Sequence, residues 1–322
     1  FDCLVGSEMC IRDSTIFELL LLAKPCPSYQ RSKRVRRGLS RHLIGRKVID
    51  LQLRRSDLRF PFPDGFKQQI EDSEIISVDR RAKYLLIRLN SGITWLSHLG
   101  MSGRWTLIGG GRETRPGKFL HGAEIGTGEG PHDWVVAHLD DGGKAVYSDH
   151  RRFGIMDFFP TDGENEYKLL SHLGPEPIPG QLSPMDLANS LRGKRTPIKS
   201  ALLDQRIIAG LGNIYVCEIL HRSGVSPRRT ATNVAGLSGV SKRVEKLTYN
   251  THEVITEAID SGGSTLQDFR GVDGDDALGY FPHSFGVYGR EGKNCTKSEC
   301  DGVIRRIVQS NRSTFYCPGC QN

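Results

Sequence analysis

Residues 295–320 read CTKSECDGVIRRIVQSNRSTFYCPGC, and this stretch decides the fold of the C-terminal part of the chain. Cys295 and Cys300 are separated by four residues, sixteen residues follow, and Cys317 and Cys320 are separated by two. Two closely spaced thiol pairs are a common ligand set for a tetrahedral structural zinc ion. Two disulfides are the alternative, and the reducing interior of a cell argues against them. The spacing therefore predicts a zinc ribbon with one structural Zn²⁺ as its cofactor.

The residues between the two cysteine pairs alternate as strands do. Val303–Val308 and Ser313–Tyr316 are two expected strands, joined by a turn that carries Asn311 and Arg312. The surrounding C-terminal segment is polar and too short for an apolar core of its own. Metal binding must therefore supply its folding free energy, and we expect this zinc finger to occupy residues 280–322.

The chain that precedes the finger has a helical pattern. Ser183 and Thr196 are each expected to cap a helix, because a proline, favoured at the first helical position, follows them. Apolar residues then recur at spacings near three, four and seven before Gly262, which predicts an amphipathic helix of about 20 residues. These apolar positions are Val240, Val244, Leu247, Val254, Ala258 and Ile259. Residues 165–275 are expected to form a helical domain.

The N-terminal half favours β-structure. It contains short runs of branched and aromatic residues, a pattern typical of a sandwich or barrel. The runs are Tyr84–Leu89, Ile93–His98, Trp134–Leu139 and Ala145–Ser148. Gly109–Pro131 is rich in glycine and charge without periodicity, so we expect a long surface loop there. Residues 35–160 are expected to form a β-sandwich domain.

Composition limits the classes of function. A chain of 322 residues is long enough for more than one hydrophobic core. Its 44 lysines and arginines exceed its 37 acidic residues and give a net charge of +7, which favours a polyanionic partner, although ordinary basic proteins share this excess. No run of 18 apolar residues and no convincing signal peptide is present, so we expect a cytoplasmic protein without a membrane partner.

Five separated segments resemble the formamidopyrimidine-DNA glycosylases, a bacterial family of DNA-(apurinic or apyrimidinic site) lyases. The segments are VRRGL at 35–39, RRAKYLL at 80–86 with HLGMSG at 98–103, DHRRFG at 149–154, LDQRIIAGLGNIY at 203–215, and NRSTFYC at 311–317. Each alone is weak, but their order and spacing together are specific. The resemblance implies an α+β multidomain protein with an N-terminal β-sandwich, a helix–two-turn–helix domain and a C-terminal zinc finger, which matches the organisation inferred above.

The resemblance also implies a function. Such enzymes bind damaged double-stranded DNA in base-excision repair, remove oxidised purines such as 8-oxoguanine and formamidopyrimidines, and cut the strand by β,δ-elimination. We expect a monomer associated with the bacterial nucleoid. Two alternatives remain open: an endonuclease VIII-like glycosylase for oxidised pyrimidines, and a DNA-binding protein without catalysis. The RRFG segment and the long loop before the ribbon favour the first of the three functions.

Excision requires an extruded base, because the glycosidic carbon of a stacked nucleotide is inaccessible, and the vacated space must then be filled. Met101, Arg151 and Phe153 match the residues that fill this space in the family. Apolar wedges can stack between base pairs, and a guanidinium can hydrogen-bond the orphaned partner base. Core packing is the alternative for Met101 or Phe153 considered alone.

Phosphate contacts are assigned by the same matching. The matching residues are Lys83, His132, Lys194, Asn213 and Arg312, whose side chains carry the donors that a bent DNA backbone requires. In family terms, Lys83 is also the acid–base group of β-elimination, and Arg312 acts in δ-elimination. This chain departs from the pattern at Trp134, where many relatives have a second histidine, so any role of that ring is lost.

The expected nucleophile is absent. Family members attack the sugar with the secondary amine of an N-terminal proline, which forms a Schiff base, while a neighbouring glutamate protonates the opening sugar ring. Where Met-Pro-Glu-Leu-Pro-Glu-Val-Glu-Thr should precede Val35, this chain has CPSYQRSKR at 26–34. Pro27 lies inside the chain, so its nitrogen is an amide and cannot attack.

A shift of reading frame accounts for this difference. The codons ATG CCC GAG CTA CCA GAG GTC GAA ACG encode the expected start, and the same bases read one position later encode CPSYQRSKR. Residues 3–14 also resemble translated sequencing-adaptor read-through. We therefore expect residues 1–34 to be a non-native segment, and the chain as written to be inactive in glycosylase chemistry.

Overall fold

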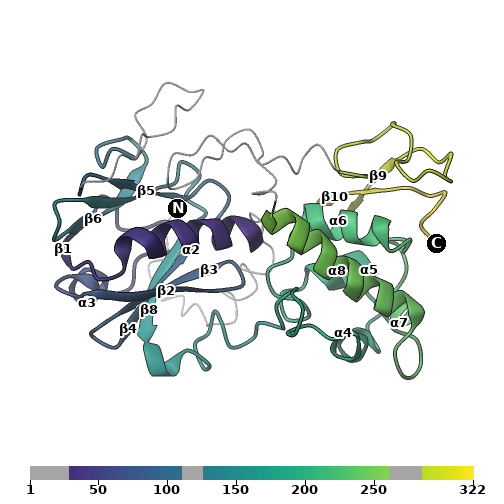
Figure 1. The fold of residues 1–322 in the computed structure, drawn as a ribbon, viewed down its shortest axis with the longest axis horizontal. Helices are drawn as coiled ribbons and strands as arrows, with labels where there is room; N and C mark the ends of the chain where they lie inside the picture. The colour runs from purple at the N-terminus through teal and green to yellow at the C-terminus, as the bar shows by residue number, and fades with distance from the viewer. Residues whose placement is uncertain (1–28, 111–125, 261–284) are drawn as a thin grey trace, which may run out of the picture.

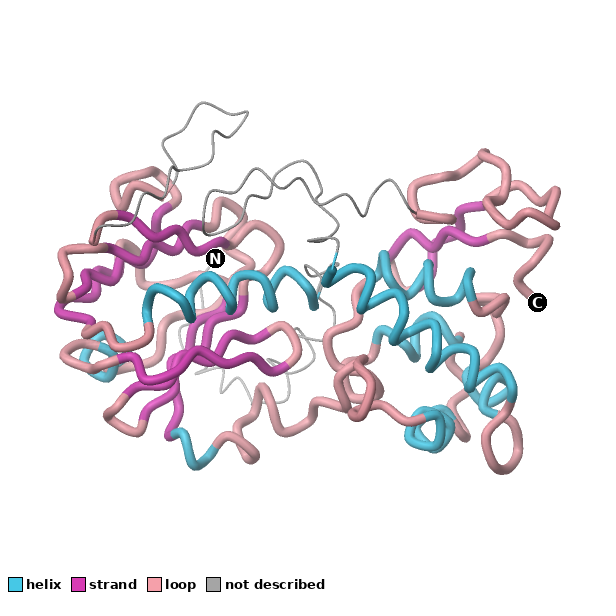
Figure 2. Tube along the Cα trace, viewed as in Figure 1, coloured by secondary structure: helices cyan, strands magenta, loops and turns pink. Residues whose placement is uncertain are grey.

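The computed structural model describes residues 29–110, 126–260 and 285–322. Strands dominate the first part of the chain, helices dominate the second, and a short hairpin with its loops forms the third (Figures 1 and 2). Among the helices of these ranges, none combines the length and the apolar character that crossing a membrane requires. The α+β character expected from the sequence is therefore present, whereas the domain boundaries remain predictions.

Two four-stranded antiparallel sheets form the N-terminal domain. One sheet has the strand order β1-β6-β7-β5, and the other has the order β2-β3-β4-β8. Their strands are β1 Val48–Leu53, β2 Ile75–Arg81, β3 Tyr84–Leu89, β4 Ile93–His98, β5 Arg104–Ile108, β6 Asp133–Leu139, β7 Lys144–Ser148 and β8 Ile155–Pro160. The four strand runs expected from the sequence all correspond to strands. The two sheets face each other across a shared core, in which the ring centroids of Trp95 on β4 and Trp105 on β5 lie 5.3 Å apart. The domain is therefore a sandwich.

Two helices pack on this sandwich. They are α2 Tyr29–Leu43 and α3 Phe66–Ile70. Along α2, Val35, Leu39 and Leu43 are buried at four-residue intervals, so one face of the helix joins the sandwich core. One end of α2 contacts α8 of the helical domain, so this helix connects the two domains (Figure 1).

The helical domain has a separate core. Its helices are α4 Pro184–Leu191, α5 Ile198–Leu203, α6 Asn213–Arg222, α7 Ala231–Ala235 and α8 Lys242–Asp260. Ser183 caps α4 as predicted, because its side chain accepts the backbone N–H of Asp186 in a capping box. The amphipathic helix is likewise confirmed as α8, although Val240 lies before its first turn and Gly262 lies outside the described residues.

The prediction for Thr196 was wrong. α5 begins one residue later than expected, with Pro197 at the N-cap position and no side-chain cap. The backbone explains the difference: Pro197 pairs with Thr230 in an isolated bridge, and the carbonyl of Thr196 accepts the N–H of Ala231. An extended segment held in this way leaves Thr196 outside the helix start.

The C-terminal hairpin agrees with the predicted ribbon, with shifted ends. Its strands are β9 Arg305–Gln309 and β10 Arg312–Tyr316, which pair antiparallel. The connecting residues Ser310 and Asn311 have φ values of 49° and 57°, the left-handed conformation that a two-residue hairpin turn uses.

Candidate nucleic-acid interface and metal centre

Lys83 lies at the junction of the two large domains. It follows Ala82, whose φ of 51° makes the tight turn between β2 and β3. Its side chain is 9% exposed, and Nζ donates a hydrogen bond of 2.9 Å to the carbonyl of Leu211, two residues before α6. The ammonium group is thus placed beside the N-terminus of a helix from the other domain.

Glu176 fixes the same turn, and sequence analysis did not single it out. Its carboxylate accepts bonds of 3.1 and 2.7 Å from the Arg80 guanidinium and one of 2.6 Å from the backbone N–H of Ala82. The Arg80 and Glu176 side chains are 9% and 6% exposed, so this is a buried ion pair with hydrogen-bond partners on both sides. The ion pair holds Lys83 in position. The only part of this pair that lies in a segment singled out from the sequence is Arg80, in the RRAK motif.

Met101 and the Arg151–Phe153 segment come together although almost fifty residues separate them in sequence. Gly100, with a φ of 57°, lies so close to Phe153 that an added Cβ would be 2.4 Å from the Phe153 carbonyl carbon. The Arg151 guanidinium lies over the Phe153 ring, 4.8 Å from its centroid. The three residues predicted to fill the space of an extruded base therefore belong to one part of the surface.

His132 lies beside this segment. Its ring is 5.8 Å from that of Trp134 and 6.1 Å from that of His150, and its carbonyl accepts the Asp149 N–H. Trp134 was expected to lose the role of the second histidine in relatives. In the structure its indole N–H donates to the Asp149 carbonyl at 2.7 Å, and the Arg55 guanidinium lies over its ring. The tryptophan thus supports the Arg151 segment.

His98 is close to Lys83 and is uncharged. Burial first, and then the positive charges of Lys83 and Arg59, lower the pKa of His98 to about 3. Its Nδ1 accepts the N–H of Gly100, which links β4 to the loop that carries Met101. A neutral imidazole in this position adds no charge to the neighbourhood of Lys83.

Asn213 and Arg312 meet where α6 contacts the hairpin. The Asn213 amide, on the first residue of α6, donates to the Ser313 carbonyl at 2.8 Å. Arg312 opens β10, next to Ser313, and its charge contributes to a lowered pKa at Lys199, for which burial is the main cause. Asn213, Arg312 and Lys83 therefore converge around the start of α6.

Lys194 is placed differently. It is exposed in the loop between α4 and α5, and its backbone bonds to Leu191 and Thr232. No contact of its side chain with the group around α6 is seen among the described residues. Of the five residues predicted to hold phosphate, three gather around the start of α6, His132 lies near the Arg151 segment, and Lys194 occupies a loop of the helical domain.

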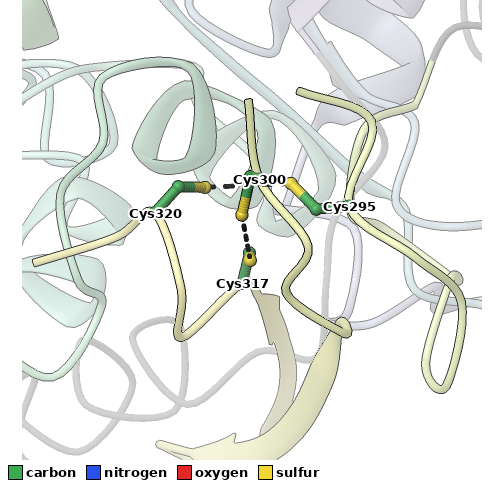
Figure 3. Close-up of side chains that lie close together, drawn as sticks. All are labelled: Cys295, Cys300, Cys317 and Cys320. Atoms are coloured by element: carbon green, nitrogen blue, oxygen red, sulfur yellow. Dashed lines mark hydrogen bonds between the residues drawn. The ribbon is translucent and has the colours of Figure 1, made fainter. Parts of the chain in front are cut away.

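The four cysteines of the finger form one cluster. All of their Sγ atoms lie within 4.8 Å of one another. Figure 3 shows the four side chains gathered together. Gly302 and Gly319 close the space around them, since a Cβ on Gly302 would lie 2.6 Å from the Cys317 sulfur. Four thiols converging on one point are suited to a single soft cation, and their spacing suits tetrahedral coordination. The predicted metal ligands therefore fit a metal ion.

Two side chains of α6 attach the finger, and sequence analysis singled out neither of them. Glu218 is 2% exposed and accepts the backbone N–H groups of Gly286, Val287 and Tyr288 at 2.8 to 3.1 Å. His221 lies with its Nε2 3.3 Å from the Cys295 sulfur. Both contacts span about seventy residues of sequence, so no local pattern could reveal them.

Comparisons with known proteins agree with this arrangement. The family model of the formamidopyrimidine-DNA glycosylase N-terminal domain matches residues 30–156, and that of the formamidopyrimidine-DNA glycosylase H2TH domain matches residues 173–270. The formamidopyrimidine-DNA glycosylases of Ruegeria pomeroyi and Chelativorans sp. are 46% and 47% identical to this chain. Each match covers 92% of this chain and 99% of the relative.

Solved structures show the same fold. A Lactococcus lactis Fpg mutant bound to DNA containing Fapy-dG superposes with a TM-score of 0.76 at 26% identity, covering 92% of this chain and all of the other. The wild-type Lactococcus lactis Fpg bound to DNA containing an oxidised pyrimidine gives a TM-score of 0.75 at the same identity and coverage. Two matched domains, relatives well above 40% identity and this shared fold establish that the chain belongs to the formamidopyrimidine-DNA glycosylase family.

Proposed function

We propose that the native form of this protein is a bifunctional DNA glycosylase and DNA-(apurinic or apyrimidinic site) lyase that removes oxidised purines from duplex DNA. The convergence of Met101, Arg151 and Phe153 on one surface carries this proposal. Two apolar side chains and one guanidinium are the groups needed to occupy a vacated stack and to bond the orphaned base. The relative from Lactococcus lactis binds DNA containing Fapy-dG, an oxidised purine lesion.

The charged groups around α6 complete the proposed reaction site. Lys83 and Arg312 supply cations and Asn213 supplies an amide donor at the start of a ten-residue helix, an arrangement suited to a phosphate group. We assign to Lys83 the proton transfer of β-elimination and to Arg312 a role in δ-elimination. His132 and Lys194 are assigned to phosphates farther along the DNA.

A second substrate class has one observation in its favour. The wild-type Lactococcus lactis enzyme has been solved with DNA containing an oxidised pyrimidine. Duplexes that carry either 8-oxoguanine or 5-hydroxycytosine, each opposite the same base, separate the two substrate classes. The test uses protein in which residues 1–34 are replaced by Pro-Glu-Leu-Pro-Glu-Val-Glu-Thr, because the chain as written is expected not to excise bases. Faster single-turnover excision of 8-oxoguanine by this protein supports the purine assignment, and a reversed order contradicts it.

The bound metal is proposed to be one structural Zn²⁺. Four sulfur ligands in closed coordination are typical of zinc sites that stabilise folds and leave no position open for substrate. Metal analysis of freshly purified protein should give one zinc per chain. Folded protein without zinc would contradict this assignment.

We propose further that residues 1–34 come from a shifted reading frame and that the native protein has the proline amine. The surroundings of α2 support this proposal. Ser32 is 2% exposed in the same stripe as Val35 and Leu39, where the other frame encodes valine. A polar residue in an apolar stripe is the pattern that a frame change would leave.

Two charged residues of the same helical turn also support a change of reading frame. Burial and then the charges of Arg37 and Arg80 lower the pKa of Lys33, where the other frame encodes glutamate. The charge of Arg31 opposes that of buried Arg104, and the other frame encodes glutamate there as well. An acidic side chain at either position would be attracted by the cations that now repel it.

Borohydride trapping tests this proposal, because reduction of an imine between the protein and the DNA sugar links the two covalently. The chain as written should bind abasic DNA without being trapped. Replacing residues 1–34 by Pro-Glu-Leu-Pro-Glu-Val-Glu-Thr should restore trapping and excision. The matched control carries one alanine before that proline, which turns the amine into an amide. Efficient trapping by the chain as written would overturn the proposal.

Damaged duplex DNA is the proposed partner, and it would place the enzyme at the bacterial nucleoid. We propose that it acts as a monomer, since one chain contributes all of the residues assigned to the site. Sedimentation of the protein with a short lesion duplex should give a one-to-one complex.

A further inference from the structure

We propose that Ser102 and Asp149 join two loops into one preformed wedge, so that Met101, Arg151 and Phe153 enter the duplex together. The Met101 loop is defined as residues 99–103 and the Arg151 loop as residues 149–154. The inference rests on the proposed function, which assigns these three side chains to the vacated stack. It adds the residues that position them and predicts that the three act in a coupled way.

Ser102 connects the loops directly. Its hydroxyl donates to Oδ1 of Asp149 and accepts the backbone N–H of Arg151 at 3.1 Å. A hydroxyl can donate once and accept once at the same time, so both bonds form together. The residue next to Met101 is thereby bonded to the backbone of the residue that reads the partner base.

Asp149 holds the Arg151 loop closed from the inside. Its side chain is 1% exposed, and its Oδ2 accepts the N–H of Gly154 at 2.7 Å, at the far end of the same loop. Its carbonyl accepts the N–H of Arg152 and the indole N–H of Trp134. A buried carboxylate with its bonds satisfied in this way keeps both ends of the loop at a fixed separation.

Close packing leaves the two loops no freedom to slide. A Cβ on Gly103 would lie 2.0 Å from the Tyr147 hydroxyl oxygen, and one on Gly154 would lie 1.9 Å from the same atom. Tyr147 is fully buried, so its hydroxyl cannot move aside, and one glycine of each loop packs against it. The Gly100 backbone meets the Phe153 backbone in the same way. Any movement of one loop must therefore move the other.

The Arg151 loop also stores backbone strain at its tip. Arg152 has a φ of 54°, a left-handed conformation that costs a non-glycine residue free energy. The N–H groups of Arg152 and Gly154 both donate to Asp149, and these bonds maintain Arg152 in this conformation. The loop is thus ordered before DNA arrives, and binding does not have to order the three side chains separately.

Ser102→Ala tests the connection, because it removes both bonds and leaves the backbone in place. The assay is equilibrium binding to a duplex with a tetrahydrofuran abasic analogue, which requires no nucleophile and uses the protein as it exists. Loss of two hydrogen bonds from a preordered wedge should weaken binding on the order of tenfold. Any difference in affinity between duplexes with different bases opposite the analogue should fall as well, because Arg151 loses its fixed position.

A double-mutant cycle measures the coupling. In the unaltered chain, Met101→Ala and Arg151→Ala together should weaken binding by much less than the product of their separate effects, because either change disables the wedge. In the Ser102→Ala background, the two effects should multiply. Multiplication in both backgrounds would overturn the proposed coupling.

Controls separate this inference from the proposed function. Ser77→Ala removes another serine hydroxyl that donates to a carboxylate, Oδ2 of Asp79 at 2.9 Å, far from both loops in sequence, and it should leave binding unchanged. Ser102→Thr retains the hydroxyl and should restore the base preference even if affinity falls. If Met101→Ala and Arg151→Ala have no effect on binding, the proposed function fails along with the wedge. If they weaken binding independently, only the wedge fails.

Discussion

The β-sandwich and the zinc finger hold their backbones in place by different means. In the sandwich, two sheets enclose a continuous core of aliphatic and aromatic side chains, and Trp95, Trp105 and Tyr147 form a chain of edge contacts within it. In the described part of the finger, Val287 and Ile304 are the only fully buried aliphatic residues, and the other buried groups cluster with the thiols. We therefore expect the finger to depend on a bound metal ion and on its attachment to α6.

This difference has a functional meaning. The sandwich carries Met101 and the Arg151 loop, which under the proposed function must resist the force of unstacking a base, and a large apolar core provides that rigidity. The finger carries Arg312, for which we propose a contact with a phosphate group beside α6. Glu218 and Asn213 bind the finger to that helix, so the position of Arg312 is set by α6 as much as by the metal.

Removing the metal should give the largest effect of all. Zinc contributes on the order of 10 kcal/mol to the folding of a small zinc domain, and a core with two buried aliphatic side chains cannot replace it. After chelation, amide protons of β9 and β10 should exchange rapidly, while those of β3 and β4 keep their protection. Hydrogen exchange measured by mass spectrometry tests this. If the finger amides of metal-free protein stay protected, the finger does not need a metal to fold, and the proposed difference between finger and sandwich is wrong.

The stability of the sandwich should depend on the packing of its core and not on a metal. Ile87 on β3 is fully buried, whereas Ile76 on the adjacent β2 is 52% exposed. Ile87→Ala should lower the free energy of unfolding by about 3.5 kcal/mol, because it removes buried methyl groups and leaves a void. Ile76→Ala is the matched control and should change it by less than about 1 kcal/mol. Urea unfolding of both variants gives the two values, and equal losses would contradict the assignment of the core.

The helical domain beneath the finger should respond to pH. Lys199 is fully buried, its Nζ has no hydrogen-bond partner within the described ranges, and burial is the main reason that its pKa is lowered to about 8. Between pH 8 and about 10.4, the unfolded chain binds more protons at this residue than the folded chain does, so stability rises with pH. The effect is a penalty for holding the charged ammonium group in the folded protein. This penalty is absent above the unfolded pKa, grows as pH falls toward 8, and lowers the free energy of unfolding by at most about 3 kcal/mol below pH 8.

Lys199→Met should abolish this part of the pH dependence, as thermal unfolding between pH 7.5 and about 10.5 can show. Lys67→Met is the control. Hydrogen bonds to Asp50 and Glu71 raise the pKa of Lys67 above its usual value, so the titration of Lys67 cannot produce a rise of stability with pH. An unchanged pH slope in Lys199→Met would mean that the lysine is solvated in solution.

What the sequence could predict depended on distance along the chain. The cysteine spacing, the Ser183 cap and the apolar period of α8 are local patterns, and all three correspond to structure. The capping prediction for Thr196 failed because the adjacent Pro197 forms a bridge with Thr230, more than thirty residues away, and this bridge competes with helix capping. Glu176 and Glu218 could not be found, since their partners are 94 and about 70 residues away and a single acidic residue has no local signature.

The smallest expected effect concerns the one polar residue in the buried stripe of α2. Ser32→Val should raise the free energy of unfolding by about 1 kcal/mol, because two buried methyl groups replace a hydroxyl whose bond to the Ala82 carbonyl is 3.2 Å long. That carbonyl keeps its bond from Arg80, so no buried acceptor loses its partner. Ser40→Val is the matched control, since Ser40 makes the same kind of bond to Val78 from a half-buried position of the same helix and should gain nothing. A gain at Ser32 alone would mean that the sandwich is shaped for the valine of the other reading frame, whereas a loss at Ser32 would show that the site accommodates serine and would remove this support for the frame shift.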